Sequence, residues 1–93
     1  MNAPTMSIFA TPMGKAGLGI LKRLEEAGHA AYFVGGCVRD ALLGRPVKDI
    51  DIATGARPEQ VMALYPNAVP TGIAHGTVTV PLGGWNFEVT TFR

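Results

Sequence analysis

Residues 32–54, YFVGGCVRDALLGRPVKDIDIAT, have the pattern of a strand, a glycine turn, a short helix and a second strand. The apolar run that ends before Gly35 is short enough for a buried strand, and Gly36 extends the turn. Because glycine has no Cβ, the two residues predict a sharp turn whose backbone amides stay accessible. Residues 38–43 then predict a short helix that ends at Gly44.

The second strand of this unit carries two carboxylates on one face. Side chains alternate between the faces of a strand, so Asp49 and Asp51 share one face. Ile50 and Ile52 share the other face and fix the strand in a core. Two carboxylates this close repel each other unless a cation lies between them. Such oxygen ligands suit Mg²⁺, which proteins typically bind with one or two carboxylates plus phosphate and water.

The glycine turn adds a second element of a site. A turn that opens a helix offers unpaired N–H groups and the positive end of the helix dipole, and both favour phosphate. Arg39 lies in the first turn of that helix, and a guanidinium group suits two-point contact with phosphate. The alternative is an ion pair of Arg39 with Asp40 or Asp49. A phosphate site beside a carboxylate pair indicates nucleotide chemistry.

A third carboxylate lies near the end of the chain. In the predicted hairpin of residues 76–93, Glu88 lies on the face opposite Phe87 and Val89. If this strand pairs with the strand of Asp51, Glu88 becomes a third acidic group of the site. The alternative is an exposed strand residue with no such role.

The motifs in combination resemble the head domain of class II tRNA nucleotidyltransferases (CCA-adding enzymes) and bacterial poly(A) polymerases. The matching motifs are GGCVRD (35–40), LGRP (43–46), DIDIAT (49–54), PEQVM (58–62), HGTV (75–78) and EVTTFR (88–93). They occur in the family's order. The resemblance extends over residues 28–93.

This resemblance implies an α+β fold, the palm of the DNA polymerase beta-like nucleotidyltransferases. The palm is expected as a small mixed sheet of four or five strands, with helices on one face and the carboxylates exposed on the other. Residues 14–93 are expected to form this head domain, truncated at its C-terminus, and residues 1–13 an N-terminal arm interrupted by Pro4 and Pro12.

The resemblance also implies an enzyme that adds CMP and AMP from CTP and ATP to the 3′ end of tRNA or another RNA. The 3′ hydroxyl attacks the α-phosphate and pyrophosphate leaves. By the family's pattern, Asp49 and Asp51 bind two Mg²⁺ ions and Glu88 joins them as a catalytic carboxylate. The nucleotide-binding positions are Gly35, Gly36 and Arg39.

Three alternatives remain open from the sequence. The first is the head of a bacterial poly(A) polymerase. The second is a nucleotide- or metal-binding module that is inactive in isolation. The third is a metal-dependent glycosyltransferase, since some use Asp-x-Asp, although the chain lacks a long parallel-sheet nucleotide domain. The roles of Asp40, which is placed to orient Arg39 or cap backbone groups, and of His75 also stay open.

Composition limits the class of protein. With 93 residues, 47% of them hydrophobic and 16% charged, the chain is expected to form one small globular domain. A net charge of +1 without a run of Lys or Arg places any RNA-binding surface mostly outside this chain. The single cysteine excludes an internal disulfide and the common zinc sites. Without a signal peptide or a membrane-length apolar run, a cytoplasmic protein is expected.

Outside the central unit, the expected elements are a helix at residues 14–28, a second helix at 55–66, a loop at 67–75 and the hairpin at 76–93 with its turn at 81–84. The chain stops at Arg93 directly after a strand. Because a last strand can leave an unpaired edge, self-association through that edge is expected to be possible.

Overall fold

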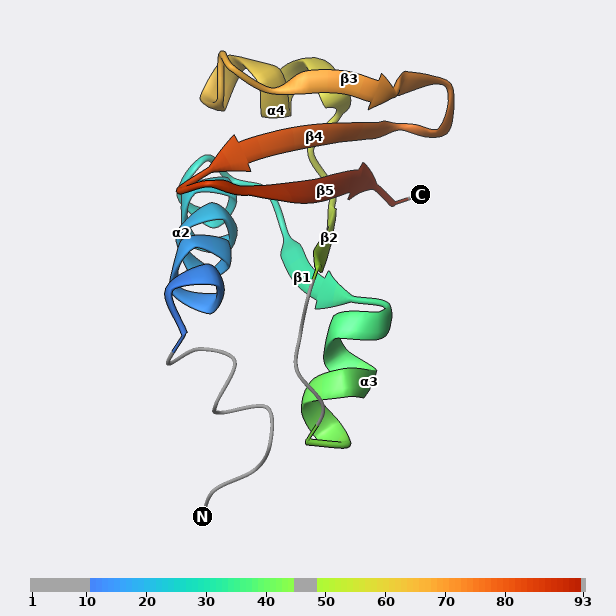
Figure 1. Ribbon diagram of the computed structural model, residues 1–93. Coiled ribbons are helices and arrows are strands. Elements are labelled where there is room, and N and C mark those ends of the chain that lie inside the picture. The colour runs from blue at the N-terminus through green and yellow to red at the C-terminus, as the bar shows by residue number, and fades with distance from the viewer. Residues whose placement is uncertain (1–10, 45–48, 93) are drawn as a thin grey trace.

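The computed structural model describes residues 11–44 and 49–92 (Figure 1). Its elements are α2 (Pro12–Glu26), β1 (Ala31–Val34), α3 (Gly36–Leu42), β2 (Ile50–Thr54), α4 (Pro58–Leu64), β3 (Val69–Gly72), the 3₁₀ helix η1 (Ile73–His75), β4 (Thr77–Leu82) and β5 (Trp85–Thr91). Most of the predicted N-terminal arm, residues 1–10, lies outside the described residues.

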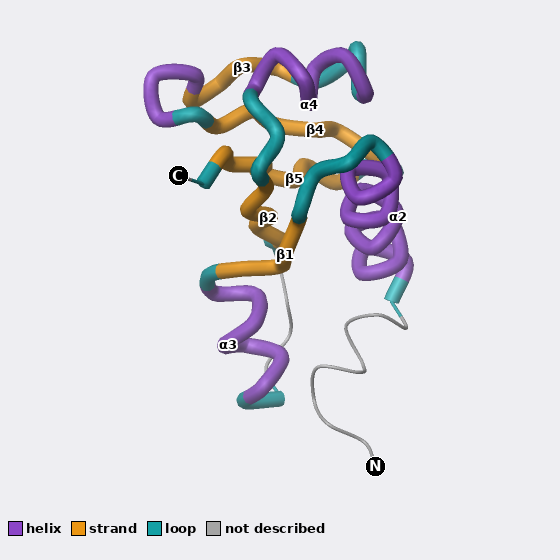
Figure 2. The backbone as a smooth tube through the Cα atoms, turned by 180° about the vertical axis from the view of Figure 1, so that it is seen from behind, coloured by secondary structure: helices purple, strands orange, loops and turns teal. Residues whose placement is uncertain are grey.

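The five strands form one mixed sheet in the order β1-β2-β5-β4-β3. β2 and β5 run parallel, whereas the other neighbours are antiparallel. The parallel pair arises because the chain leaves β2, passes through α4, β3 and β4, and returns as β5 beside β2. Figure 2 shows the same arrangement from behind. The prediction of a small mixed sheet with four or five strands is confirmed.

One face of the sheet carries the core. Its fully buried strand side chains are Ile50, Ile52, Val78, Val80, Phe87 and Val89. From the helices, Ile20 and Leu24 of α2 and Val61 of α4 pack into the same cluster. Burying one such side chain stabilises the fold by about 1.5–3 kcal/mol. α2 and α4 therefore cover this face, and α3 extends from the end of β1 (Figure 1).

Helix α2 begins earlier than the sequence pattern predicted. The sequence pattern predicts a start at residue 14, because proline interrupts a helix, but Pro12 is the first helical residue. A proline needs no N–H partner at that position, so it starts the helix well. The side chain of Thr11 accepts a hydrogen bond from the Gly14 N–H at 2.9 Å and caps the end.

The predicted loop at residues 67–75 is wrong in part, because it contains β3 and η1. β3 pairs only with β4, and its register shifts between Val69 and Gly72. Pro70 cannot donate to a ladder, which is tolerated on an edge strand. A strand this short and irregular has no alternating apolar pattern by which it could be predicted.

The β4–β5 hairpin is confirmed with a tighter turn than predicted. Pro81 and Leu82 belong to β4, and only Gly83 and Gly84 form the turn. Their φ angles are +63° and +89°. Positive φ at both positions is what a type I′ hairpin turn requires, and glycine adopts it without strain.

The position of β5 corrects the expectation about the C-terminal strand. β5 pairs with β2 on one side and β4 on the other, so it has no free edge. The edges of the sheet are β1 and β3. In the described ranges, no helix is long and apolar enough to cross a membrane.

Candidate active site

Two carboxylates lie side by side in one row of the sheet. The register pairs Asp51 of β2 with Glu88 of β5. The same row continues to Val34 on β1 and to Thr79 on β4. Because the alternate positions of β2 and β5 are buried in the core, Asp51 and Glu88 lie on the opposite face. The strand of Glu88 therefore pairs with the strand of Asp51, which was the condition for Glu88 to be a third acidic group of the site.

Asp49 lies directly before β2 and is exposed. Burial raises the pKa of Asp51 above its ordinary value of 3.8, and the negative charges of Glu88 and Asp49 raise it further. Glu88 and Asp49 are therefore each close enough to Asp51 to interact with it electrostatically. A cation bound among them would relieve this repulsion.

The glycine turn touches the carboxylate row. Gly35 has a φ of +76°, which residues other than glycine rarely adopt. A Cβ built on Gly35 would lie 3.1 Å from Oδ2 of Asp51. The turn therefore passes close to the Asp51 carboxylate, which would have to shift to admit a side chain at Gly35. A group bound at the turn is then a direct neighbour of the acidic row.

Arg39 lies at the same turn and forms a long ion pair with Asp40. Its Nε is 4.0 Å from Oδ1 of Asp40, and its side chain is 71% exposed. An exposed pair at that distance contributes little. A Cβ on Gly36 would lie 3.5 Å from a terminal nitrogen of Arg39, so the guanidinium folds back over the turn.

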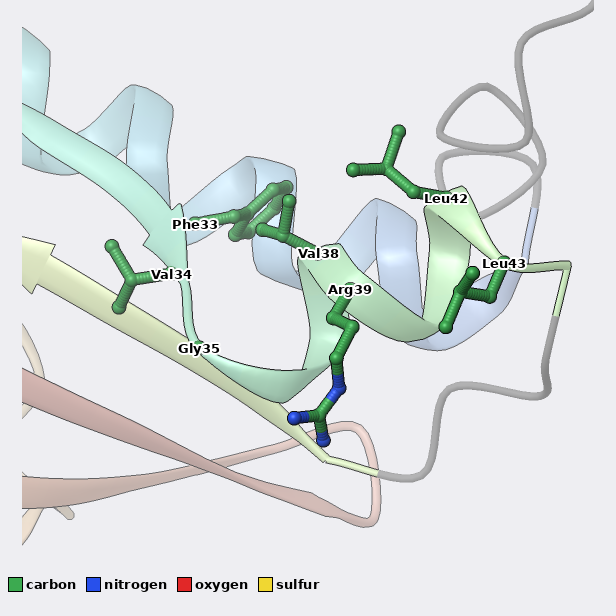
Figure 3. A pocket seen from close by; sticks show the side chains of 7 residues that line it. All are labelled: Phe33, Val34, Gly35, Val38, Arg39, Leu42 and Leu43. Carbon is green, nitrogen blue, oxygen red and sulfur yellow. The ribbon is translucent and has the colours of Figure 1, made fainter.

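An apolar pocket of about 510 Å³ lies between the end of β1 and helix α3 (Figure 3). Its lining residues are Phe33, Val34, Gly35, Val38, Arg39, Leu42 and Leu43. In Figure 3 the guanidinium of Arg39 points away from Val38 and Leu42. Neither Asp51 nor Glu88 lines this pocket, but Gly35 and Arg39 of the glycine turn do, so the pocket borders the carboxylate site without including it.

Glu88 has a hydrogen-bond partner that sequence reasoning missed. The hydroxyl of Thr79 donates to Oε2 of Glu88 at 2.6 Å. The hydroxyl of Thr71 on β3 lies 2.7 Å from that of Thr79. The alternation of threonine and valine in β4 could have placed Thr79 on the carboxylate face. The pairing of β4 with Glu88 and the existence of β3 were needed to find these contacts.

The carboxylate row fits a divalent cation only in part. Within residues 11–44 and 49–92, no three acidic, histidine or cysteine side chains converge closely enough to hold a metal ion by themselves. The structure instead offers Asp51 and Glu88 on paired strands, with Asp49 nearby. Mg²⁺ usually takes one or two carboxylates from the protein and completes its shell with phosphate and water. The donor set therefore suits Mg²⁺ together with a phosphate-bearing substrate.

His75 lies elsewhere in the described part of the fold. It is exposed in η1, between β3 and β4. Arg45 and Lys48, which the sequence places near the carboxylates, fall outside the described residues.

The raised pKa of Asp51 predicts a pH-dependent stability. Its folded-state pKa exceeds the ordinary 3.8, so the charged form destabilises the fold. Stability from this group falls as pH rises from 3.8 through the folded pKa, and the loss is complete above that value. Asp51→Asn should therefore melt at a higher temperature than the unmodified chain at pH 7. The gain should shrink as the pH falls toward 3.8. Thermal unfolding in metal-free buffer at several pH values measures this, and an equal gain at every pH would contradict it.

Comparison with known proteins identifies the class. Residues 31–93, more than half of the chain, match the family model of the poly(A) polymerase head domain. The chain therefore belongs to this family, and the resemblance recognised from its motifs is confirmed.

The most similar relatives include CCA-adding enzymes. The chain is 61% identical over 74 residues to that of Lactobacillus delbrueckii subsp. bulgaricus, covering 80% of this chain and 19% of the relative. It is 60% identical over 76 residues to that of Anoxybacillus flavithermus, covering 82% of this chain and 19% of the relative. The chain thus spans about a fifth of the length of these relatives.

Solved structures show the same fold. The crystal structure of the Bacillus stearothermophilus CCA-adding enzyme in complex with CTP matches with a TM-score of 0.83 and 54% identity, over 88% of this chain and 21% of that one. A tRNA nucleotidyltransferase complexed with a primer tRNA and an incoming ATP analog matches with a TM-score of 0.65 and 32% identity, over 80% and 23% of the two chains. The predicted α+β nucleotidyltransferase fold is confirmed.

Proposed function

We propose that the chain is the head domain of a CCA-adding tRNA nucleotidyltransferase, which adds CMP and AMP from CTP and ATP to the 3′ end of tRNA. The observation that carries this proposal is the pairing of Asp51 with Glu88 on parallel strands, directly against the Gly35 turn. The high identity to CCA-adding enzymes supports the choice of substrates. Template-independent transfer to an RNA end then follows from membership of the family.

The carboxylate row is proposed as the Mg²⁺ site. Asp49 and Asp51 would be ligands, and Glu88 would complete the acidic cluster beside them. Bound Mg²⁺ supplies Lewis-acid activation of the attacking hydroxyl and neutralises charge on the leaving phosphates. The protein's own contribution is to fix the carboxylates on a rigid sheet, where their mutual repulsion favours a cation.

The glycine turn is proposed as the triphosphate site. The absence of side chains at Gly35 and Gly36 leaves the backbone open to phosphate oxygens. The exposed guanidinium of Arg39, folded back over the turn, supplies positive charge there. Since the turn touches Asp51, phosphates bound at Gly35 would lie next to the proposed metal ligands.

The RNA partner is proposed to bind mainly through parts of the enzyme that this chain does not contain. A formal net charge of +1 provides no strongly basic surface for a tRNA. Catalysis by the chain alone is therefore not expected, although nucleotide binding is. A cytoplasmic location and self-association through the edge strands β1 or β3 are parts of the same proposal.

A bacterial poly(A) polymerase head is the second candidate. The observation that favours it is the family model itself, which describes the heads of such polymerases. A poly(A) polymerase needs ATP alone, whereas CCA addition needs CTP as well. Specific binding of ATP with no binding of CTP would therefore favour this candidate.

Calorimetric titration of CTP and ATP into the chain, with Mg²⁺ and then with EDTA, tests the proposed function. Both nucleotides are expected to bind with Mg²⁺, and neither in EDTA. Similar affinities for the two would place base selection outside this chain. UDP-glucose serves as the control ligand, and tighter binding of the sugar-nucleotide would favour the glycosyltransferase alternative. Absence of any nucleotide binding by the folded chain would contradict the proposed site.

A further inference from the structure

Thr79 of β4 is a buried polar residue whose hydroxyl donates a hydrogen bond to the carboxylate of Glu88. Its side chain is 9% exposed. Its Oγ1 donates to Oε2 of Glu88 at 2.6 Å, within the 2.5–2.7 Å that is usual for a hydroxyl bound to an ionised carboxylate. The register places the two residues directly opposite each other on antiparallel strands.

Thr71 of β3 extends this contact into a chain of two hydrogen bonds. Its hydroxyl lies 2.7 Å from Oγ1 of Thr79. An ionised carboxylate only accepts hydrogen bonds, so the single hydroxyl hydrogen of Thr79 is committed to Glu88. The hydroxyl of Thr71 must therefore be the donor to Thr79. The hydrogen bonds run in one direction, from Thr71 through Thr79 to Glu88.

This chain of hydrogen bonds lies on the side of Glu88 away from Asp51. Across the sheet the order is Asp51 on β2, Glu88 on β5 and Thr79 on β4. A glutamate side chain has three rotatable bonds, and repulsion from Asp51 acts on its carboxylate. The hydrogen bond from Thr79 to Oε2 restricts the rotation of the Glu88 side chain. It also stabilises the negative charge of Glu88 beside the negative charge of Asp51.

We propose that Thr79, with Thr71 behind it, is a positioning residue for the acidic site: it fixes the Glu88 carboxylate so that it and Asp51 act on one divalent cation. The proposal rests on the metal site of the proposed function. Ligating carboxylates commonly have such hydrogen-bond partners, and loss of one typically weakens metal affinity about 10–100-fold. Thr71 is expected to matter less, because it acts on Glu88 only through Thr79.

The chain offers a matched control in Thr77. It lies on the same strand, and its hydroxyl also pairs with a threonine, Thr90 of β5, at 2.8 Å. No carboxylate takes part in that pair. Thr77→Val and Thr79→Val each replace a strand threonine by a side chain of the same shape, and each breaks a threonine hydrogen bond. Only Thr79→Val removes a donor to Glu88.

Binding of Mn²⁺ alone, followed by the loss of its free electron paramagnetic resonance signal, tests the inference on the whole chain. The variants are Thr79→Val, Thr79→Ser, Thr77→Val and Asp51→Asn, with thermal unfolding as a check of folding. Thr79→Val is expected to bind Mn²⁺ roughly tenfold more weakly. Thr79→Ser, which keeps the hydroxyl, and Thr77→Val should stay within about twofold of the unmodified chain.

The outcomes separate this inference from the proposed function. If the unmodified chain binds Mn²⁺ and Asp51→Asn does not, the metal site stands. Equal affinity of Thr79→Val and the unmodified chain would then overturn the positioning role alone. An equal loss in Thr79→Ser and Thr79→Val would also overturn it, because the hydroxyl would not be the cause. If the unmodified chain binds no Mn²⁺ alone, the same variants are compared by Mg²⁺-dependent binding of CTP, and absence of that binding as well means that the metal site and the positioning role are both wrong.

Discussion

Asp51→Asn is expected to abolish Mg²⁺-dependent binding of CTP and ATP. Asp51 is the central one of the three carboxylates, since the charges of both Glu88 and Asp49 raise its pKa. An asparagine keeps the shape but removes the negative charge that attracts the cation. The loss of affinity should exceed roughly a hundredfold, the upper end of what loss of an outer hydrogen-bond partner costs a metal site. Calorimetric titration of each nucleotide with Mg²⁺ measures it.

Glu59→Gln is the control for the loss of one negative charge. Glu59 lies in the first turn of α4 and pairs with Arg57 at 2.9 Å, and both side chains are about two-thirds exposed. The variant should bind both nucleotides as the unmodified chain does, since an exposed pair of this kind contributes little to the fold. If Asp51→Asn binds CTP with unchanged affinity, Asp51 is not a metal ligand. An equal loss in both variants would indicate a general effect of charge.

Gly35→Ala is expected to damage both the fold and the site. A non-glycine residue in the left-handed region costs about 1–2 kcal/mol. In a domain of this size that lowers the melting temperature by roughly 5–15 °C. The added Cβ would also lie 3.1 Å from Oδ2 of Asp51, so the carboxylate must shift. Nucleotide binding with Mg²⁺ should therefore fall as well. Thermal unfolding and calorimetric titration measure the two effects.

Gly44→Ala separates the two effects. Gly44 has a φ of +72°, close to that of Gly35, but a Cβ there meets no atom of the described residues within 4 Å. The variant should lose a similar amount of stability and keep its affinity for CTP. If Gly35→Ala binds CTP as tightly as Gly44→Ala does, the contact between the turn and Asp51 has no role in binding.

The local parts of the site could be predicted from the sequence. The glycine turn, the short helix and the alternation of Asp51 with Ile50 and Ile52 depend only on neighbouring residues. The structure places Asp51 on the open face and Ile50 and Ile52 in the core, as the alternation predicts. The role of Asp51 as a metal ligand stays a prediction.

The non-local parts could not be predicted from periodicity. Glu88 is a site residue only if β5 lies beside β2, and a strand's pattern does not name its neighbour. The strand pattern therefore left Glu88 open, the family resemblance included it in the site, and the parallel pairing brings it to Asp51. For the same reason Thr79 was missed, because its contact depends on the register of β4 against β5. Pro12 was misjudged because proline interrupts a helix but also starts one well.

The central place of β5 has a consequence for the order of folding. Of the five described strands, β5 is synthesised last, and it joins β1-β2 on one side to β3-β4 on the other. Until it emerges from the ribosome, the chain has only two separate strand pairs, which are marginal on their own in water. The acidic row, with Asp51 and Glu88 far apart in the sequence, therefore forms in the same late step that completes the sheet. A nascent chain that pauses before Trp85 therefore lacks the pairing of Asp51 with Glu88.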